Sequence, residues 1–250
     1  MKILLTNDDG INAEGLFAIY KELKKIAQVI VVAPDSQRSS VGQAITLASI
    51  LKLEKVRIRG KFSGYSTNGT TADCVKMAIK LILKKKPDAV VSGINLGPNE
   101  GCSVYYSGTV GGAREGALLG IPSLAVSLST FSNPDFAYAA KLGTKLVKTM
   151  LKNQLPRGTF LNLNVPNKPK KQIKGIKITE QCMVPIHTTF HKKKAPNGHE
   201  YYWMSGDKPN TKRNLCKDTD ALNQDYVTIT PIQCDSTDYA FIKMLKSWKF

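Results

Sequence analysis

The sequence predicts an α/β fold built on a parallel sheet. Short apolar runs of strand length alternate with stretches in which apolar residues recur at helical spacing. The runs carry apolar residues at consecutive positions, as strands buried on both faces do. The chain has 250 residues, which is enough for one large α/β domain or two small ones. The five central strands are expected at residues 3–6, 29–33, 89–91, 122–128 and 160–165.

The first expected strand, residues 3–6, runs directly into Asn7, Asp8, Asp9 and Gly10. A helix should follow, with Asn12 as its N-cap. One face of this helix would carry Leu16, Ile19, Leu23 and Ile26. Two neighbouring carboxylates would then lie where a parallel strand ends, which is the edge of an α/β sheet at which ligands bind.

Adjacent carboxylates repel each other, and a divalent cation would remove that cost. Magnesium and manganese prefer hard oxygen ligands of this kind. The alternative is an ordinary turn with both carboxylates solvated, because Asn, Asp and Gly are common turn residues. From this stretch alone both interpretations stay open.

The second strand is expected to end at Pro34, before a loop rich in hydroxyl groups, APDSQRSSVGQAIT. Loops at strand ends often carry functional residues. Ser39 or Ser40 could present a hydroxyl beside the carboxylates, although this loop alone is more typical of a plain polar turn. Residues 45–67 then indicate antiparallel strands or a hairpin.

Asn68 and Gly69 form a turn signal, after which Thr70 or Thr71 is expected to cap a helix over about residues 72–83. The strand at 89–91 leads into a glycine-rich stretch, SGINLGPNEGCSVYYSGTVGGAREGALLG. Asn95 is expected just past the end of that strand. Free amides at the start of the next helix, expected at about 110–119, would form a phosphate cradle. The residues of that cradle are Ser107, Gly108 and Thr109; an ordinary capped helix is the alternative.

The α/β pattern continues to about residue 166, with a helix expected from Pro134 to about residue 153. Residues 167–250 differ in composition and are interpreted as an extension that packs on, or exchanges with, a second subunit. Strands are expected there at 176–179, 201–204 and 227–230, and a helix at 238–248. His187 and His191 have the spacing of a metal pair but are expected in a loop without function.

Composition excludes several classes of protein. The chain is 42% hydrophobic and 22% charged, as soluble proteins are, and no apolar run approaches the roughly 18 residues of a membrane span. Its first residues lead directly into a strand, so no signal peptide is expected. The five cysteines are widely spaced without a CxxC pair. We therefore expect reduced thiols and a cytoplasmic location.

The formal net charge is +17, and lysine dominates the 36 basic residues. A lysine surplus spread along a chain most often forms a solvated surface, and secondarily steers anionic substrates. The chain lacks the aromatic clusters and sequence signatures of RNA-binding modules. No dedicated nucleic-acid partner and no membrane partner are therefore expected.

Several stretches together resemble the SurE family of metal-dependent nucleoside monophosphate phosphatases. The matching stretches lie in family order and span nearly the whole chain. They are LLTNDDGI at 4–11, APDSQRSSVG at 33–42, GTTADCV at 69–75, VSGIN at 91–95, YSGTVGGAREG at 106–116, LNLNVP at 161–166 and DTDA…DYVTITP within 218–231.

The resemblance implies a three-layer α/β/α fold with a mixed, Rossmann-like sheet. It also implies a homodimer or homotetramer in which a C-terminal hairpin and helix reach across subunits. One divalent ion per subunit, Mg²⁺ or Mn²⁺, would be bound by Asp8, Asp9, Ser39 and Asn95. The implied substrates are nucleoside 5′- and 3′-monophosphates, with short-chain polyphosphate in some members.

Our hypothesis is metal-assisted hydrolysis of a phosphomonoester, with Asp8 and Asp9 as the catalytic carboxylates. The residues expected to bind the phosphate are Ser39, Asn95, Ser107, Gly108 and Thr109. The chain carries Ser103 where family members commonly have Asp, and a missing carboxylate near a metal site could retune it. That difference motivates the alternative of a catalytically weak nucleotide-binding sensor.

Overall fold

The computed structural model describes residues 1–207 and 217–249. A nine-stranded sheet runs through the body of the molecule in the order β3-β4-β2-β1-β5-β6-β7-β11-β8. Its strands are β1 Lys2–Thr6, β2 Gln28–Pro34, β3 Leu53–Ile58, β4 Phe62–Thr67, β5 Ala89–Leu96, β6 Ser123–Ser129, β7 Thr159–Pro166, β8 Gly175–Ile178 and β11 Tyr226–Gln233. All five predicted central strands are confirmed.

The sheet is mixed, as the family resemblance implied. The strands β4, β2, β1, β5, β6 and β7 pair in parallel. The edge strand β3 is antiparallel to β4, and β11 is antiparallel to β7. Because the central strands are parallel, their carboxyl ends meet at one edge of the sheet, where ligand sites of open α/β sheets form.

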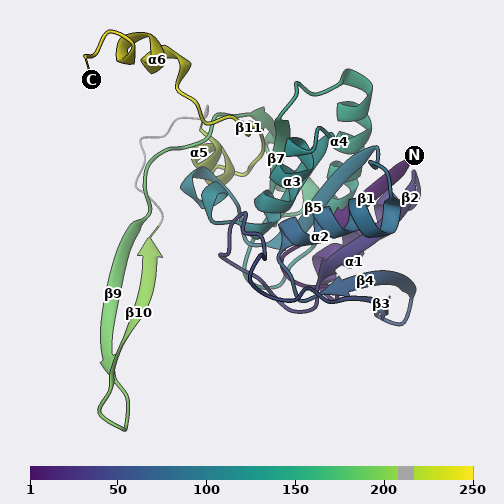
Figure 1. Cartoon of the computed structure of the whole chain (residues 1–250), viewed down its shortest axis with the longest axis horizontal. Helices are drawn as coiled ribbons and strands as arrows, with labels where there is room; N and C mark the ends of the chain where they lie inside the picture. Colours follow the sequence, from purple (N-terminus) through teal and green to yellow (C-terminus); the bar gives the residue numbers. More distant parts are fainter. Residues whose placement is uncertain (208–216, 250) are drawn as a thin grey trace.

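Helices cover both faces of the sheet (Figure 1). They are α1 Glu14–Leu23, α2 Thr71–Met77, α3 Gly108–Leu118, α4 Ala137–Asn153 and α5 Asp218–Asn223. Alternate residues of β1 show the two faces: Ile3 and Leu5 pack in the core beneath α1 and α4, whereas Leu4 packs against α2. This alternation follows from the two-residue period of a strand. The three-layer α/β/α fold is therefore confirmed.

The C-terminal region divides into two parts. The strands β8 and β11 extend the main sheet, whereas the hairpin of β9 His187–Lys194 and β10 Glu200–Asp207 projects away from the body. The last helix, α6 Tyr239–Leu245, also lies outside the body (Figure 1). The hairpin and α6 are together called the C-terminal arm below.

Three predictions about helix starts and loops are wrong. The first helix is not capped by Asn12: the turn after Gly10 continues for another residue, and Ala13 N–H donates to the Gly10 carbonyl at 3.1 Å. The fourth helix begins at Ala137 rather than at Pro134, because the Asp135 carboxylate accepts from Ala137 N–H at 2.9 Å.

The third concerns His187 and His191, which lie in the strand β9 and not in a loop. His191 Nε2 is 2.9 Å from Ser205 Oγ across the hairpin.

Other features agree with the sequence. Thr70 caps α2 and forms a reciprocal pair with Asp73, and Thr71 begins the helix. The four cysteines within the described ranges are free thiols, while Cys216 lies outside them. No helix among the described residues is long and apolar enough to cross a membrane.

Candidate active site

The two neighbouring carboxylates lie in the turn between β1 and α1. Gly10 closes this turn at φ +100°, and a side chain there would meet the backbone of Ser36 at 3.3 Å. Asn7 braces the same turn by donating from Nδ2 to the Gly10 carbonyl at 3.0 Å. A tight glycine turn thus fixes the direction in which Asp8 and Asp9 leave the strand.

Asp8 is buried against the first turn of α3. The Thr109 hydroxyl donates to Asp8 Oδ1, and the backbone N–H groups of Gly108 and Thr109 also face the carboxylate. A Cβ at Gly108 would lie 2.8 Å from Asp8 Oδ2, so only glycine allows this approach. Burial raises the pKa of Asp8, and these hydrogen bonds partly offset the effect.

Asp9 points toward the end of β5. Its Oδ2 accepts from the Leu96 backbone N–H at 3.2 Å. Burial, followed by the neighbouring charge of Asp8, raises the pKa of Asp9 to about 6, while the Leu96 bond lowers it. A pair of carboxylates with raised pKa values indicates negative charge that no protein cation neutralises.

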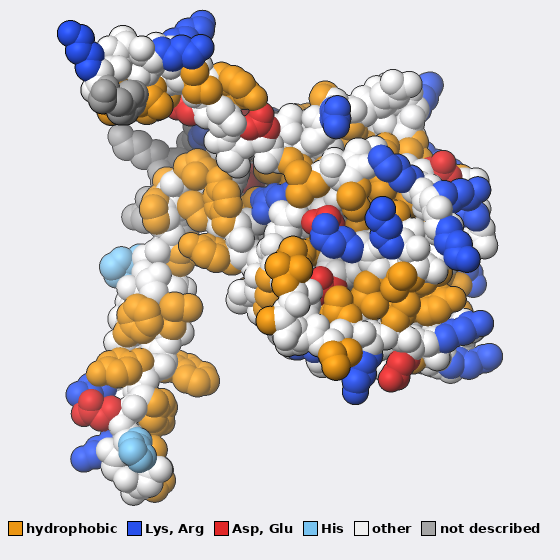
Figure 2. Space-filling view, in the orientation of Figure 1, with side chains coloured by type: hydrophobic (Ala, Val, Ile, Leu, Met, Phe, Trp, Pro, Cys, Tyr) orange, Lys and Arg blue, Asp and Glu red, His pale blue; other side chains and the backbone are white. Residues whose placement is uncertain are grey.

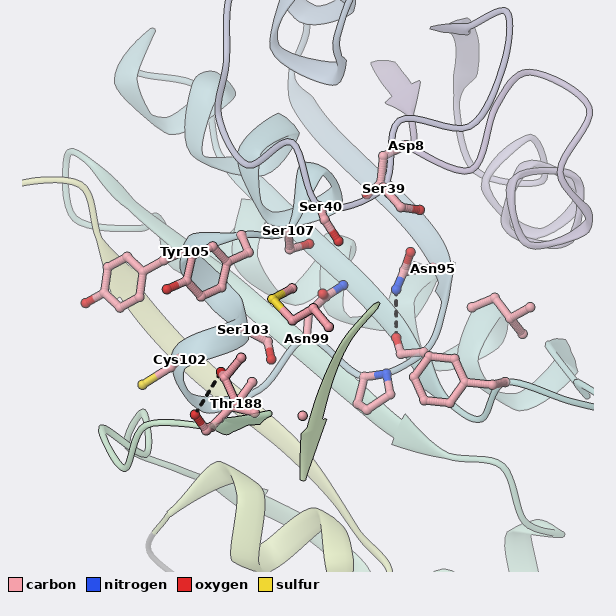
Figure 3. A pocket seen from close by; sticks show the side chains of 18 of the residues that line it. Asp8, Ser39, Ser40, Asn95, Asn99, Cys102, Ser103, Tyr105, Ser107 and Thr188 are labelled. Carbon is pink, nitrogen blue, oxygen red and sulfur yellow. Dashed lines mark hydrogen bonds between the residues drawn. The ribbon is translucent and has the colours of Figure 1, made fainter. Parts of the chain in front are cut away.

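Asn95 was expected just past the end of its strand, but it lies within β5. The pairing of β5 with β6 shifts between Ser92 and Asn95, and this irregularity turns Asn95 toward the carboxylates. Asn95 Nδ2 donates to the Gly97 carbonyl at 2.7 Å. That bond leaves the amide oxygen facing Asp8 and Ser39 (Figure 3).

The loop after β2 brings Ser39 to the same place. Arg38 N–H donates to the Asp8 carbonyl at 2.7 Å, and Gln37 Nε2 donates to Ser39 Oγ at 2.8 Å. Both Ser39 and Ser40 line the pocket beside Asp8 (Figure 3). The sequence left open whether Ser39 or Ser40 lies beside the carboxylates. In the structure both line the cavity next to Asp8.

Farther along, this loop is bound to α2 and α3. Gln43 Nε2 donates to the buried Glu115 carboxylate at 3.0 Å. The Thr46 hydroxyl and N–H donate to Asp73 at 2.7 and 3.1 Å. Residues far from the carboxylates in sequence therefore hold the serine loop against the helices.

These groups surround one end of a cavity of about 870 Å³. Asp8, Ser39, Asn95 and Ser107 line this end, whereas Asp9, Gly108 and Thr109 are not among the lining residues. The Ser107 hydroxyl accepts from Val110 N–H at 3.1 Å, which leaves its own proton free to donate. The predicted phosphate cradle is thus split: Ser107 faces the cavity, and Gly108 and Thr109 face Asp8.

Two sets of buried polar residues without a role predicted from the sequence support the opposite wall of the cavity. Asn99 is buried: its N–H donates to Asn164 Oδ1 at 2.8 Å, and its carbonyl accepts from Asn162 Nδ2 at 2.7 Å. Two asparagines within the apolar strand FLNLNV were the available signal, because buried amides need hydrogen-bond partners.

The second set of residues is centred on Asp218. It is fully buried and accepts from the N–H groups of Gly101 and Cys182 at 2.9 and 2.8 Å. The DTDA stretch was therefore a signal for a wall that links the C-terminal region to the cavity.

The donor set fits a hard divalent cation. Asp8 and Asp9 offer carboxylate oxygens, and Ser39 and Asn95 offer neutral oxygens that line the cavity beside Asp8. Among residues 1–207 and 217–249, no three His, Cys, Asp or Glu side chains form a metal-binding group. A cation here would therefore rely on neutral oxygens and water for its remaining ligands, as Mg²⁺ commonly does.

Known proteins are similar to this chain over nearly its whole length. The model of the family described as Survival protein SurE matches residues 3–188. A protein of Chlorobium chlorochromatii described as 5′-nucleotidase SurE is 43% identical over 247 residues, covering 99% of this chain and 91% of the relative. A protein with the same description from Desulfatibacillum aliphaticivorans is also 43% identical, covering 100% of this chain and 98% of the relative.

A solved structure shares the fold of this chain. The crystal structure of the Sure protein from Aquifex aeolicus superposes with a TM-score of 0.86 at 40% identity, covering 98% of each chain.

Proposed function

Since the chain belongs to the SurE family, we propose that it is a 5′-nucleotidase that hydrolyses nucleoside monophosphates to nucleoside and phosphate. Water adds to the phosphorus atom, the ester oxygen leaves with a proton as the nucleoside hydroxyl, and phosphate is released. The observation that carries the proposal is the convergence of Asp8, Ser39, Asn95 and Ser107 at one end of the cavity. Activity on 3′-monophosphates is part of the proposal.

The chain's own residues have separable roles in this proposal. Ser107 and the serine loop face the cavity, so they would donate hydrogen bonds to the phosphoryl oxygens. Asn95 is held by the Gly97 carbonyl so that its amide oxygen faces the carboxylates. Thr109 donates a hydrogen bond to Asp8 and would keep that carboxylate in place. A phosphate contact of Gly108 and Thr109 stays a prediction.

One divalent ion per subunit, Mg²⁺ or Mn²⁺, would be held by Asp8, Asp9, Ser39 and Asn95. When bound, it supplies positive charge that polarises a phosphoryl oxygen and lowers the pKa of a water molecule. The raised pKa values of Asp8 and Asp9 support this assignment, because two uncompensated carboxylates favour a cation between them. We assign orientation of the attacking water to Asp8, since it lines the cavity and Asp9 does not.

A nucleotide sensor with little activity is the second candidate. Ser103, at a position where the family resemblance implies Asp, is the feature that favours it. Ser103 lines the cavity in the short helix η2 Gly101–Tyr105, and no carboxylate takes its place among the lining residues there. Tight binding of AMP without phosphate release would favour the sensor over the enzyme.

Short-chain polyphosphate is a further proposed substrate. Asp8 is the only charged side chain among the described lining residues, so no cation of the cavity would pair with a second phosphate. We therefore expect polyphosphate to be hydrolysed more slowly than AMP.

The test is phosphate release from AMP and GMP with Mn²⁺, with Mg²⁺ and with a chelator. Asp8→Asn and Asp9→Asn should each lower turnover about 100-fold or more, because each removes a charge that would act in the transition state. Asp88→Asn at the opposite edge of the sheet is the matched control and should leave turnover unchanged. Circular dichroism checks that all variants fold. Wild-type turnover in Asp8→Asn would refute the assigned role.

Homo-oligomerisation in the cytoplasm completes the proposal. The C-terminal arm exposes large apolar side chains that a second subunit could cover (Figure 2). These include Phe190, Trp203, Tyr239 and Trp248. Light scattering would distinguish a dimer from a tetramer, and a monomer at micromolar concentration would contradict the proposal.

A further inference from the structure

The cavity is far larger than its phosphate end. Pockets that bury a drug-sized ligand measure roughly 300–1,000 Å³. The 870 Å³ found here could therefore enclose a whole nucleotide and not only its phosphate. The far end is lined by residues of three segments: the wall after β5, the loop after β6 and the root of the β9–β10 hairpin.

Large apolar side chains gather at this far end. Tyr105, Tyr106, Phe131 and Met204 all line the cavity, and each is more than half exposed to solvent. Phe131 is 78% exposed and Met204 68%. Apolar surface left in water is unfavourable, so four such side chains around one cavity indicate a ligand that covers them.

The polar groups at the far end are neutral. Ser103, Thr188 and Ser205 contribute hydroxyls, and Asn99 contributes an amide. Among the described lining residues the one charged side chain, Asp8, lies at the phosphate end. A second phosphate or a charged peptide would find no partner there, whereas a flat, uncharged ring with polar edges would find both apolar surface and hydrogen-bonding groups.

Phe131 connects the two ends. A Cβ at Gly97 would lie 2.5 Å from the Phe131 ring, so the ring rests directly on the glycine. The carbonyl of the same glycine holds Asn95. The aromatic surface therefore begins next to the residues assigned to the phosphate. Met204 comes from β10, which lies beyond the residues 3–188 that the family model matches.

We propose that the far end of the cavity is the binding site for the base of a nucleotide, and that Phe131 and Met204 determine the preference for nucleotides over smaller phosphate esters. This inference rests on the proposed function and names the part of the substrate that the apolar end takes. The base fits because it is uncharged, planar and attached to the phosphate by a short sugar. The hairpin then serves the active site of its own chain as well as any contact between subunits.

The experiment compares AMP with ribose 5-phosphate, which keeps the sugar and phosphate but lacks the base. The wild-type protein should have a kcat/KM for AMP at least about tenfold higher than for ribose 5-phosphate, because stacking of a base on an aromatic ring is a substantial interaction. In Phe131→Ala and Met204→Ala this ratio should fall toward one, mainly through KM for AMP. Leu81→Ala, which shortens an exposed apolar side chain outside both the cavity and the C-terminal arm, is the control and should keep the wild-type ratio.

Several outcomes overturn the inference. Equal hydrolysis of AMP and ribose 5-phosphate by the wild type would reject the base site while leaving the phosphatase proposal intact. The base site is also rejected if Phe131→Ala lowers the hydrolysis of AMP and of ribose 5-phosphate equally. A change in oligomeric state of both variants with an unchanged ratio would assign these side chains to an interface between copies.

If no substrate releases phosphate, the proposed function fails and binding becomes the readout. Adenosine affinity is then measured by calorimetry on the same variants. A loss of adenosine affinity of about tenfold or more in Phe131→Ala would support the base site. Absence of adenosine binding to the wild type rejects it.

Discussion

Replacing Asp9 with Asn should stabilise the metal-free protein at neutral pH, although it removes a residue assigned to the active site. The pKa of Asp9 is about 6 in the folded protein, compared with 3.8 for an unperturbed Asp. Between those values the folded state binds more protons than the unfolded state, so stability falls as the pH rises. The loss is complete once the pH has passed the folded-state pKa.

The size of the effect follows from this shift. Each pKa unit corresponds to about 1.36 kcal/mol, which sets a ceiling of about 3 kcal/mol. Solvent reaches part of the Asp9 carboxylate and screens its repulsion with Asp8, so we expect about 2 kcal/mol. Asparagine resembles the protonated acid and does not titrate, so Asp9→Asn should avoid this loss.

The assay is urea unfolding of chelator-treated protein at fixed concentration, from pH 4 to pH 7.5. The difference in unfolding free energy between Asp9→Asn and the wild type should be near zero at pH 4 and about 2 kcal/mol at pH 7.5. The difference curve cancels other titrating groups. One of them is Asp73, whose pKa is lowered by hydrogen bonds from Thr46 and Thr70. Added Mn²⁺ should stabilise the wild type more than the variant.

A difference that does not change with pH would refute the reasoning, because it would mean that the pair carries no uncompensated repulsion. A wild type more stable than Asp9→Asn at pH 7.5 without metal would refute it as well.

Two further predictions concern the residues that support the site. Thr109→Val removes the hydroxyl that donates to Asp8 and should lower turnover about tenfold or more, whereas Thr109→Ser should retain most activity; equal turnover in both variants would contradict the positioning role. Asp218→Ala leaves three buried backbone N–H groups without an acceptor, so it should lower the unfolding free energy by about 3 kcal/mol or more. Urea unfolding measures this loss, and a change below about 0.5 kcal/mol would show that water replaces the carboxylate.

Local patterns predicted the elements that are buried on both faces. The runs at 3–6, 29–33 and 160–165 are short, apolar and flanked by turn residues, a combination that favours central strands over helices. Helix ends were less predictable. Asn12 and Pro134 have the right chemistry for helix starts, but the turn at Gly10 and the carboxylate of Asp135 determine where each helix begins.

The strand β9 shows why other elements could not be predicted, although its partner β10 was expected at 201–204. Every described residue of β9 is exposed, so no buried face imposes an alternating pattern on the sequence. Its lysine-rich run was therefore interpreted as a loop around His187 and His191. Cross-strand pairing between β9 and β10 forms the hairpin, and that pairing depends on the partner strand rather than on the local sequence.

The candidate site was predicted in composition but not in arrangement. Asp8, Asp9, Ser39 and Asn95 were identified from motifs, and the structure brings them to one edge of the sheet. Which groups face the cavity could not be inferred, because it depends on contacts between distant segments. Thr109 turns to Asp8 and Ser107 turns to the cavity, although the two are separated by one residue.

The sequence by itself determined the order of the central strands and of the helices between them, the family, and the presence of paired carboxylates after the first strand. These follow from periodicity and from short motifs, which are properties of neighbouring residues. Only the tertiary structure decided that Asn99 and Asp218 brace the wall of the cavity and that Met204 of the hairpin reaches the same cavity as Asp8. The physical reason is that buried polar groups and apolar surfaces find partners through the packing of the whole chain, whatever the distance between them in sequence.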